Sequence, residues 1–202
     1  MANHLSSSGY EQRGVLFDLD GVLLDTETTY SEIWTAIEQR FPTGVQDFCH
    51  VIKGRNLHEI LTNYFATDDI RRQVTALLND YQQHMRYELF AGAMDVVLGL
   101  ERMGVPAAVV TSSDRHKMEA VYAQLPDFRS HFAAMVTGEM VVRAKPNPEC
   151  FLLGARLLRR DITHCVVVED SLNGLFAARA SGARVAGIAT TLPKPLQRAA
   201  VA

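Results

Sequence analysis

Two aspartates and a glycine at the end of an apolar run are the residues of this 202-residue chain best suited to chemistry. Residues 15–17 are apolar, and Asp18, Leu19, Asp20 and Gly21 follow directly. On an extended strand, residues two apart point to the same side, so the two carboxylates can converge on one point. Two carboxylates that close repel each other unless a cation or a shared proton lies between them. The alternative is a strand ending in ordinary turn residues, since Asp and Gly are common there.

A hydroxyl pair follows the predicted strand at residues 107–110. Thr111 and Ser112 lie between that strand and a predicted helix. Helix N-termini offer free N–H donors and partial positive charge, so hydroxyls at this position are compatible with an anion site. An ordinary helix cap by Ser113 or Asp114 is the alternative, and taken alone it explains the pattern better.

A lysine and a second pair of acids complete the set of polar groups. Lys145 lies in a loop with two prolines, which argue against a freely moving surface lysine, and a fixed ammonium is a good point-charge ligand for phosphate. Glu169 and Asp170 follow the apolar strand at residues 165–168. Paired acids at two strand ends favour a bound cation, and oxygen-rich sites suit Mg²⁺. Helix capping by Asp170 or Ser171 is the alternative.

Helix and strand patterns alternate from residue 93 onward, after one isolated strand near the N-terminus. The predicted strands run to residue 18 and over residues 107–110, 133–136, 165–168 and 185–189, and the predicted helices cover residues 93–102, 115–124, 148–159 and 173–180. This alternation predicts an α/β fold, a Rossmann-like, doubly wound parallel sheet. Because parallel strands end at the same edge of such a sheet, the acids, hydroxyls and lysine are expected to lie together there.

The stretch between the first strand and residue 90 has helical spacing and no convincing strand pattern. Apolar residues recur at helical intervals around Trp34, Ile60 and Val74. We therefore expect an all-helical domain at residues 25–90, inserted into an α/β core formed by residues 1–24 and 91–202.

Composition narrows the class of protein further. Hydrophobic residues make up 48% of the chain, enough for a sizeable core, and the net charge of −3 gives no sign of a nucleic-acid-binding surface. Cys49, Cys150 and Cys165 are far apart and in no metal-type spacing, as expected of reduced thiols. The first 13 residues lack the apolar stretch of a signal peptide, and no run approaches the ~18 apolar residues of a membrane span. These features predict a soluble, cytoplasmic protein that binds neither nucleic acid nor membranes.

The order and spacing of these motifs resemble the haloacid dehalogenase superfamily, in its group of phosphatases and mutases with a helical cap after the first core strand. The resemblance covers about residues 14–189 and rests on four motifs in sequence order. It implies that Asp18 is the nucleophile and that Asp20 is the acid that protonates the leaving alkoxide and then activates water. The phosphate-binding residues that it implies are Thr111, Ser112 and Lys145.

The same resemblance implies a Mg²⁺ cofactor. Asp18, Asp170 and the backbone carbonyl of Asp20 would bind the ion, and Glu169 would support the metal shell. A haloacid dehalogenase proper is a weaker interpretation, because its reaction leaves no alkoxide for Asp20 to protonate. A phospho-acceptor receiver domain gathers similar groups but is shorter and lacks a helical insert. A catalytically silent binding protein is disfavoured because no group of the set is missing.

Residues of the helical insert help to distinguish a phosphatase from a phosphosugar mutase. Lys53 and Gly54 match a pair in the cap of β-phosphoglucomutase-like enzymes, but Tyr30 replaces a histidine of that group and Leu57 replaces an arginine that grips the second phosphate. Since a mutase must hold a bisphosphate by both ends, we expect a phosphatase acting on a small phosphorylated metabolite, such as a sugar phosphate. A β-phosphoglucomutase-like phosphosugar mutase stays the alternative, because Arg55 lies near the missing arginine.

Four polar residues at the turn between two cap helices are the candidates for substrate specificity. They are Lys53, Arg55, Asn56 and His58. A solvated loop with a helix cap at Asn56 explains the same residues equally well. The sequence leaves the oligomeric state open, and a monomer is compatible with it.

Overall fold

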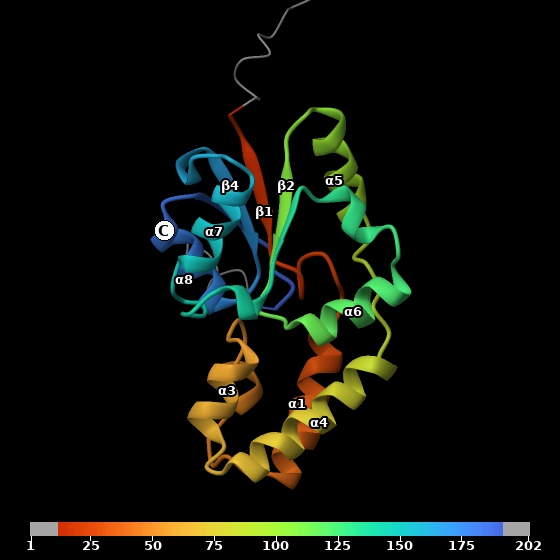
Figure 1. The fold of residues 1–202 in the computed structure, drawn as a ribbon, viewed down its shortest axis with the longest axis vertical. Helices are drawn as coiled ribbons and strands as arrows, with labels where there is room; N and C mark the ends of the chain where they lie inside the picture. Colours follow the sequence, from red (N-terminus) through yellow and green to blue (C-terminus); the bar gives the residue numbers. More distant parts are fainter. Residues whose placement is uncertain (1–11, 192–202) are drawn as a thin grey trace, which may run out of the picture.

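The computed structural model describes residues 12–191, and their core is a five-stranded parallel sheet with strand order β3-β2-β1-β4-β5 (Figure 1). The strands are β1 (Gly14–Phe17), β2 (Ala107–Val110), β3 (Ala134–Val136), β4 (Cys165–Glu169) and β5 (Arg184–Gly187). Leu16 of the central strand pairs with Ala108 on one side and Val167 on the other. The predicted α/β parallel sheet is thus confirmed.

Helices cover both faces of this sheet. The helices of the core are α5 (Ala93–Arg102), α6 (Arg115–Gln124), α7 (Glu149–Leu157) and α8 (Leu172–Ser181), and short 3₁₀ helices are η2 (Phe128–His131), η3 (Gly138–Met140) and η4 (Ile162–His164). Successive side chains of a strand point to opposite faces of the sheet, and side chains two residues apart share a face. Leu16 and Val110 pack with Phe151 of α7, whereas Phe17 and Val109 pack with the residues of α5 and α6. The adjacent strands β1 and β2 are apolar throughout, as expected where both faces of a strand are covered.

Four helices lie between β1 and α5 in the sequence and form a group of their own at the carboxyl edge of the sheet (Figure 1). They are α1 (Glu27–Arg40), α2 (Phe48–Val51), α3 (Leu57–Tyr64) and α4 (Asp68–His84), and we call this group the helical insert. Phe48 holds it together, with its ring centroid 5.9 Å from that of Trp34 and 5.2 Å from that of Tyr64. Helix α2 has no counterpart among the elements predicted from the sequence, because one turn of helix is too short to show a period.

Side-chain caps fix the starts of several helices. Asn56, Thr67, Asp114 and Ser171 each accept a hydrogen bond from the backbone N–H three residues further on. Such a cap satisfies one of the N–H groups that a helix start leaves without a partner. The sequence offered Ser113 or Asp114 as the cap of one helix and Asp170 or Ser171 as the cap of another, and the structure shows that Asp114 and Ser171 are the caps.

Most predicted elements have the expected bounds, and the differences lie at the sheet's edge. The helices at residues 93–102 and 115–124 and the strand at residues 107–110 agree with α5, α6 and β2. The strand predicted at residues 185–189 is displaced by a residue or two, since β5 runs from Arg184 to Gly187. This edge strand is largely exposed, so burial imposes no clear pattern on its sequence.

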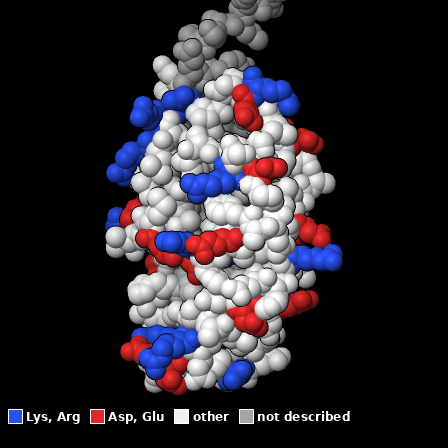
Figure 2. Space-filling model, turned by 45° about the vertical axis from the view of Figure 1, so that its right-hand side comes forward, with Lys and Arg blue, Asp and Glu red and all other residues white. Residues whose placement is uncertain are grey.

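The structure also shows how the charged side chains are distributed on one face and that the three cysteines form no disulfide among the described residues. On the face that Figure 2 shows, acidic and basic side chains of the described residues are interspersed rather than gathered by sign. Cys49, Cys150 and Cys165 are free thiols. Within residues 12–191, no helix combines the length and the apolar character needed to cross a bilayer.

Candidate active site

Polar groups from separate elements meet at the carboxyl edge of the sheet. Asp18 follows β1, Thr111 follows β2, and Glu169 ends β4. The chain turns sharply after Asp18 because Gly21 adopts a φ of 77°, and a Cβ there would collide with the carboxylate of Asp170. A glycine at this position therefore lets two strand ends approach each other closely.

Lys145 is the centre of a buried ion-pair cluster. Its side chain is 1% exposed, and its ammonium lies 2.5 Å from Asp18 Oδ1 and 2.7 Å from Glu169 Oε1. Burial alone would lower the pKa of Lys145, but the charges of Asp18 and Glu169 outweigh it and raise that pKa above its usual value. Burial is also the main reason why the pKa of Asp18 rises to about 7, against the opposing charge of Lys145. The sequence could not show that this lysine is buried.

Glu169 fixes the start of α8. Its Oε2 accepts hydrogen bonds from the backbone N–H groups of Asp170 at 2.8 Å and Ser171 at 2.7 Å. A Cβ on Gly174 would collide with the Glu169 carboxylate, so the helix can approach only because that residue is glycine. Both oxygens of Glu169 are thus engaged, one with Lys145 and one with the helix start.

Asp20 is surrounded by donors. Both of its carboxylate oxygens lie 2.5 Å from the ammonium of Lys117, and Ser113 Oγ donates to Oδ2 at 3.0 Å. Thr26 donates to Oδ1. Burial would raise the pKa of Asp20, but the Lys117 charge and the hydrogen bonds outweigh it and hold that pKa below its usual range.

Sequence reasoning missed Lys117, Thr26 and Ser113 as members of the site. Lys117 is 2% exposed and shares the buried stripe of α6 with Val121. The sequence held one signal: Lys117 lies four residues before the apolar Val121 and therefore on the same face of the helix. A lysine on a buried face needs a charged partner, since lysine is rarely buried without one. Thr26 carried no comparable signal, because its bond to Asp20 depends on the turn after β1.

The acids Asp18 and Asp170 fit a bound cation. Burial, followed by the charges of Glu169 and Asp18, raises the pKa of Asp170 to about 9, so a neighbouring positive charge would relieve both crowded carboxylates. Thr191 donates to Asp170. Among the described residues, no three histidine, cysteine or acidic side chains form a metal-binding group. A cation here would need a backbone carbonyl and water as well, which suits Mg²⁺, an ion that keeps several waters.

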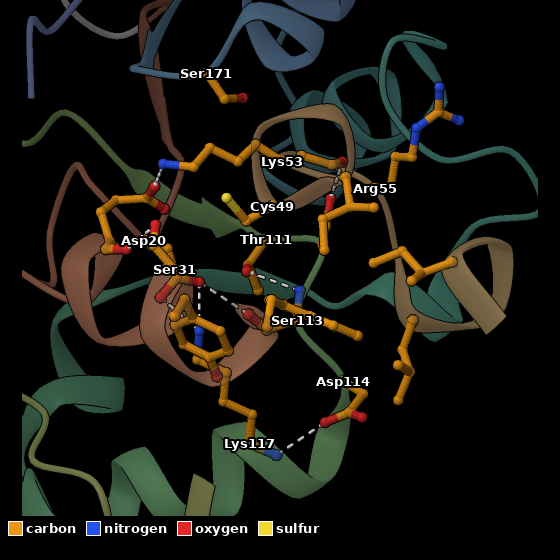
Figure 3. Close-up of a pocket in the computed structure, with 18 of the residues that line it drawn as sticks. Asp20, Ser31, Cys49, Lys53, Arg55, Thr111, Ser113, Asp114, Lys117 and Ser171 are labelled. Carbon is orange, nitrogen blue, oxygen red and sulfur yellow. Dashed lines mark hydrogen bonds and ion pairs between the residues drawn. The ribbon is translucent and has the colours of Figure 1, made fainter. Parts of the chain in front are cut away.

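A cavity of about 130 Å³ lies between these groups and the helical insert. Its core side includes Asp18, Asp20, Thr111 and Asp170, and its insert side combines apolar side chains with polar and charged ones. Figure 3 shows Asp20, Thr111 and Ser113 close together within this pocket. The predicted nucleophile, acid and phosphate-binding threonine therefore open onto one space.

Ser112 contacts the helical insert. Its hydroxyl donates to the Gly54 carbonyl at 2.6 Å, and Asn173 Nδ2 donates to the Lys53 carbonyl at 2.7 Å. These two bonds tie the turn after α2 to the core directly over the site. The side chain of Ser112 is thus engaged with the insert, while Thr111 Oγ1 accepts from the N–H of Ser113 at 3.0 Å.

The four specificity candidates divide into two pairs. Lys53 and Arg55 line the pocket, Lys53 in an ion pair with Glu27. Asn56 and His58 are absent from the described pocket lining, because Asn56 caps α3 and His58 is exposed. The capping alternative therefore explains Asn56.

Comparisons with known proteins identify the family of this chain. The family model "haloacid dehalogenase-like hydrolase" matches residues 12–182. Hexitol phosphatase A of Escherichia coli (strain K12) is 31% identical over 186 residues, covering 87% of this chain and 82% of that protein. Fructose-1-phosphate phosphatase YqaB of the same organism is 31% identical over 177 residues, covering 84% and 92%.

A solved structure supports the fold independently. A hydrolase from Pseudomonas syringae superposes with a TM-score of 0.81 at 21% identity, covering 95% of this chain and 91% of that one. The sequence matches and the convergence of three strand ends on one pocket lead to a single family. The chain belongs to the haloacid dehalogenase-like hydrolases.

Proposed function

We propose that this hydrolase is a Mg²⁺-dependent phosphatase that cleaves a small phosphorylated metabolite, a sugar phosphate, through an aspartyl-phosphate on Asp18. One observation carries the proposal: Asp18, held by Lys145, and Asp20, held by Lys117, face the same cavity. The relatives whose names specify hexitol and fructose 1-phosphate phosphatases support the substrate class.

In the first step, a carboxylate oxygen of Asp18 attacks phosphorus, and the bond from phosphorus to the ester oxygen breaks. Asp20, which takes up a proton when the substrate enters although its pKa is low in the free site, gives that proton to the departing oxygen, so the alcohol leaves neutral. Lys145 and Thr111 contact the charged oxygens of the phosphoryl group in this assignment, because both lie beside Asp18 at the sheet edge.

In the second step, water attacks the phosphorus of the aspartyl-phosphate. Asp20, now ionised, takes a proton from that water, and the carboxylate of Asp18 is released with inorganic phosphate. The donors around Asp20 stabilise its ionised form, which is the form needed here. The same residue thus acts as acid and then as base.

Asp18, Asp170 and the backbone carbonyl of Asp20 are the groups that would hold Mg²⁺. When bound, the ion offsets the negative charge that gathers as a phosphate meets two carboxylates. We assign Glu169 a supporting role, because its oxygens are engaged with Lys145 and the start of α8.

The helical insert, residues 25–90, is the cap domain in this proposal. Residues 1–24 and 91–202 are assigned to the catalytic core, of which residues 1–11 and 192–202 lie outside the described residues. The bonds of the insert to the core through Ser112 and Asn173 hold it over the pocket. A cap in this position excludes water and strengthens electrostatic contacts with the substrate. The proposed setting is the cytoplasm, with a small molecule as the partner.

A phosphate-release assay tests the proposal. The purified chain should hydrolyse p-nitrophenyl phosphate and sugar phosphates with Mg²⁺ and lose this activity with a chelator. Rapid quenching should trap a phosphorylated protein that Asp18→Asn does not form. Activity that is indifferent to chelator, or trapping that survives Asp18→Asn, would contradict the mechanism. Conversion of β-glucose 1-phosphate to glucose 6-phosphate would instead favour the mutase.

A further inference from the structure

The charges that line the pocket are compensated before any substrate enters. The described lining includes three basic side chains, Lys53, Arg55 and Lys117, and more acidic ones than basic ones. Lys117 is bound to Asp20, and Lys145, which is absent from the described lining, is bound to Asp18 and Glu169. Whether a second anionic group of a substrate could be held depends therefore on Lys53 and Arg55.

The charge of Lys53 is compensated by Glu27, another residue of the helical insert. Its ammonium forms an ion pair with Glu27 at the start of α1, and both side chains are about four-fifths buried, at 18% and 21% exposure. Figure 3 shows the Lys53 side chain extended toward this partner. An ion pair shielded from water on this scale is not easily given up to an incoming anion.

Arg55 is directed elsewhere. Figure 3 shows its guanidinium turned away from Asp20 and Ser113. Its Nε donates to the Val51 carbonyl at 3.4 Å, and its Nη1 lies 3.8 Å from Glu59 Oε2. The arginine that the sequence offered as an anchor for a second anion thus contacts two residues, Val51 and Glu59, that are absent from the described pocket lining.

The rest of the insert side is mostly apolar. Its apolar residues include Tyr30, Trp34, Ile52, Leu57, Ile60 and Leu78, and its polar exceptions are Ser31 and Gln82, whose Nε2 donates to the Tyr30 hydroxyl. Such a wall favours C–H groups and aromatic contact, whereas a second charge placed against it would lose hydration without gaining a partner.

We infer that the pocket selects phosphomonoesters whose leaving alcohol is uncharged, such as polyol or neutral sugar monophosphates, and that the Glu27–Lys53 ion pair excludes substrates with a second anionic group. This specificity rests on the proposed phosphatase function, since it concerns the alcohol released at the same site. It places bisphosphates and phosphorylated sugar acids outside the substrate range.

A matched pair of substrates tests this selection. Glucitol 6-phosphate and 6-phosphogluconate share a carbon skeleton and differ at C1, where one has a hydroxymethyl group and the other a carboxylate. We expect kcat/KM to be at least about tenfold higher for the neutral ester. Equal values, or a preference for 6-phosphogluconate, would overturn the inference.

The Glu27→Gln variant tests the ion pair itself. The freed Lys53 ammonium should raise kcat/KM for 6-phosphogluconate at least about threefold and narrow the ratio between the two substrates. Lys53→Met should show no such gain. Glu32→Gln, the same change at an exposed position of α1, is the matched control and should leave the ratio unchanged. An unaltered ratio in Glu27→Gln would show that the pair does not set specificity.

Binding separates this inference from the phosphatase proposal. Trp34 is the only tryptophan of the chain and lines the pocket, so its fluorescence reports occupancy without turnover. In Asp18→Asn, glucitol 6-phosphate should bind at least about tenfold more tightly than 6-phosphogluconate. If the wild type releases no phosphate from any ester but this preference holds, the phosphatase proposal fails, while the preference of the pocket for phosphate esters without a second charge stands. If binding shows no preference, the inference fails.

Discussion

The ammonium of Lys117 lies 2.5 Å from each carboxylate oxygen of Asp20, although 97 positions separate the two residues in the chain. The same ammonium lies 4.2 Å from the centre of the Tyr30 ring, so core helix α6 and insert helix α1 meet at this lysine. A cation that contacts both oxygens fixes the rotation of the carboxylate. The orientation of the proposed acid is thus set by a residue outside the four motifs.

Lys117→Met should therefore impair proton delivery to the leaving group. We expect kcat/KM for an alkyl phosphate to fall about 10–100-fold, because a misplaced acid loses much of its effect. The value for p-nitrophenyl phosphate should fall less than about threefold, since nitrophenolate leaves without a proton. Arg115→Met, an exposed change on the same helix, is the control. Equal losses with both esters would assign Lys117 a purely structural role.

Asp18→Asn should abolish turnover while the protein stays folded. The amide is a far poorer nucleophile than the carboxylate. Stability should hold because burial already raises the pKa of Asp18 to about 7, and Lys145 keeps Glu169 as an ion-pair partner. Thermal unfolding and phosphate release measured on one preparation check both points. Residual activity near that of the wild type would remove Asp18 from the role of nucleophile.

Mg²⁺ should stabilise the protein in a pH-dependent way. The pKa of Asp170 is about 9 in the folded state and 3.8 in a model peptide, so the metal-free fold loses stability as pH rises through that window. Saturating Mg²⁺ at pH 8 should raise Tm by about 5 °C or more, because the cation binds only the folded site.

Asp170→Asn is the matched variant for this prediction. Without metal it should be at least as stable as the wild type at pH 8, since it removes the crowded acid, and its Tm should respond little to Mg²⁺. Differential scanning fluorimetry with Mg²⁺ or chelator measures both effects. A Mg²⁺ shift as large as that of the wild type would exclude Asp170 as a ligand.

Gly174→Ala should destabilise the protein because the new methyl group would occupy the space of the Glu169 carboxylate. We expect a loss of about 2 kcal/mol or more, or several degrees in Tm, and reduced activity as Lys145 loses its fixed partner. Gly99→Ala on α5 is the control, since its Cβ would meet nothing closer than Arg102 at 3.8 Å. That change should be neutral or stabilise by up to about 1 kcal/mol. Equal Tm values for the two variants would contradict the close approach at Gly174.

Much of the fold can be predicted from the sequence because buried strands and helices leave local patterns of apolar and polar residues. The apolar strand at residues 107–110 and the helix at residues 115–124 were predicted with their observed bounds, since both are bounded by polar and turn residues. The edge strand β5 was displaced because exposure removes the pattern on which such predictions rest.

The sequence by itself determined the order of the reactive groups and the sheet edge at which they gather. Asp18, Thr111 and Glu169 each lie at the end of an apolar strand, and parallel strands of one sheet end together. Only the tertiary structure decided their partners. The contacts of Lys117 with Asp20 and of Lys53 with Glu27 join residues 97 and 26 positions apart. Such pairs leave no local pattern, because burial of one charge beside another depends on how whole elements pack.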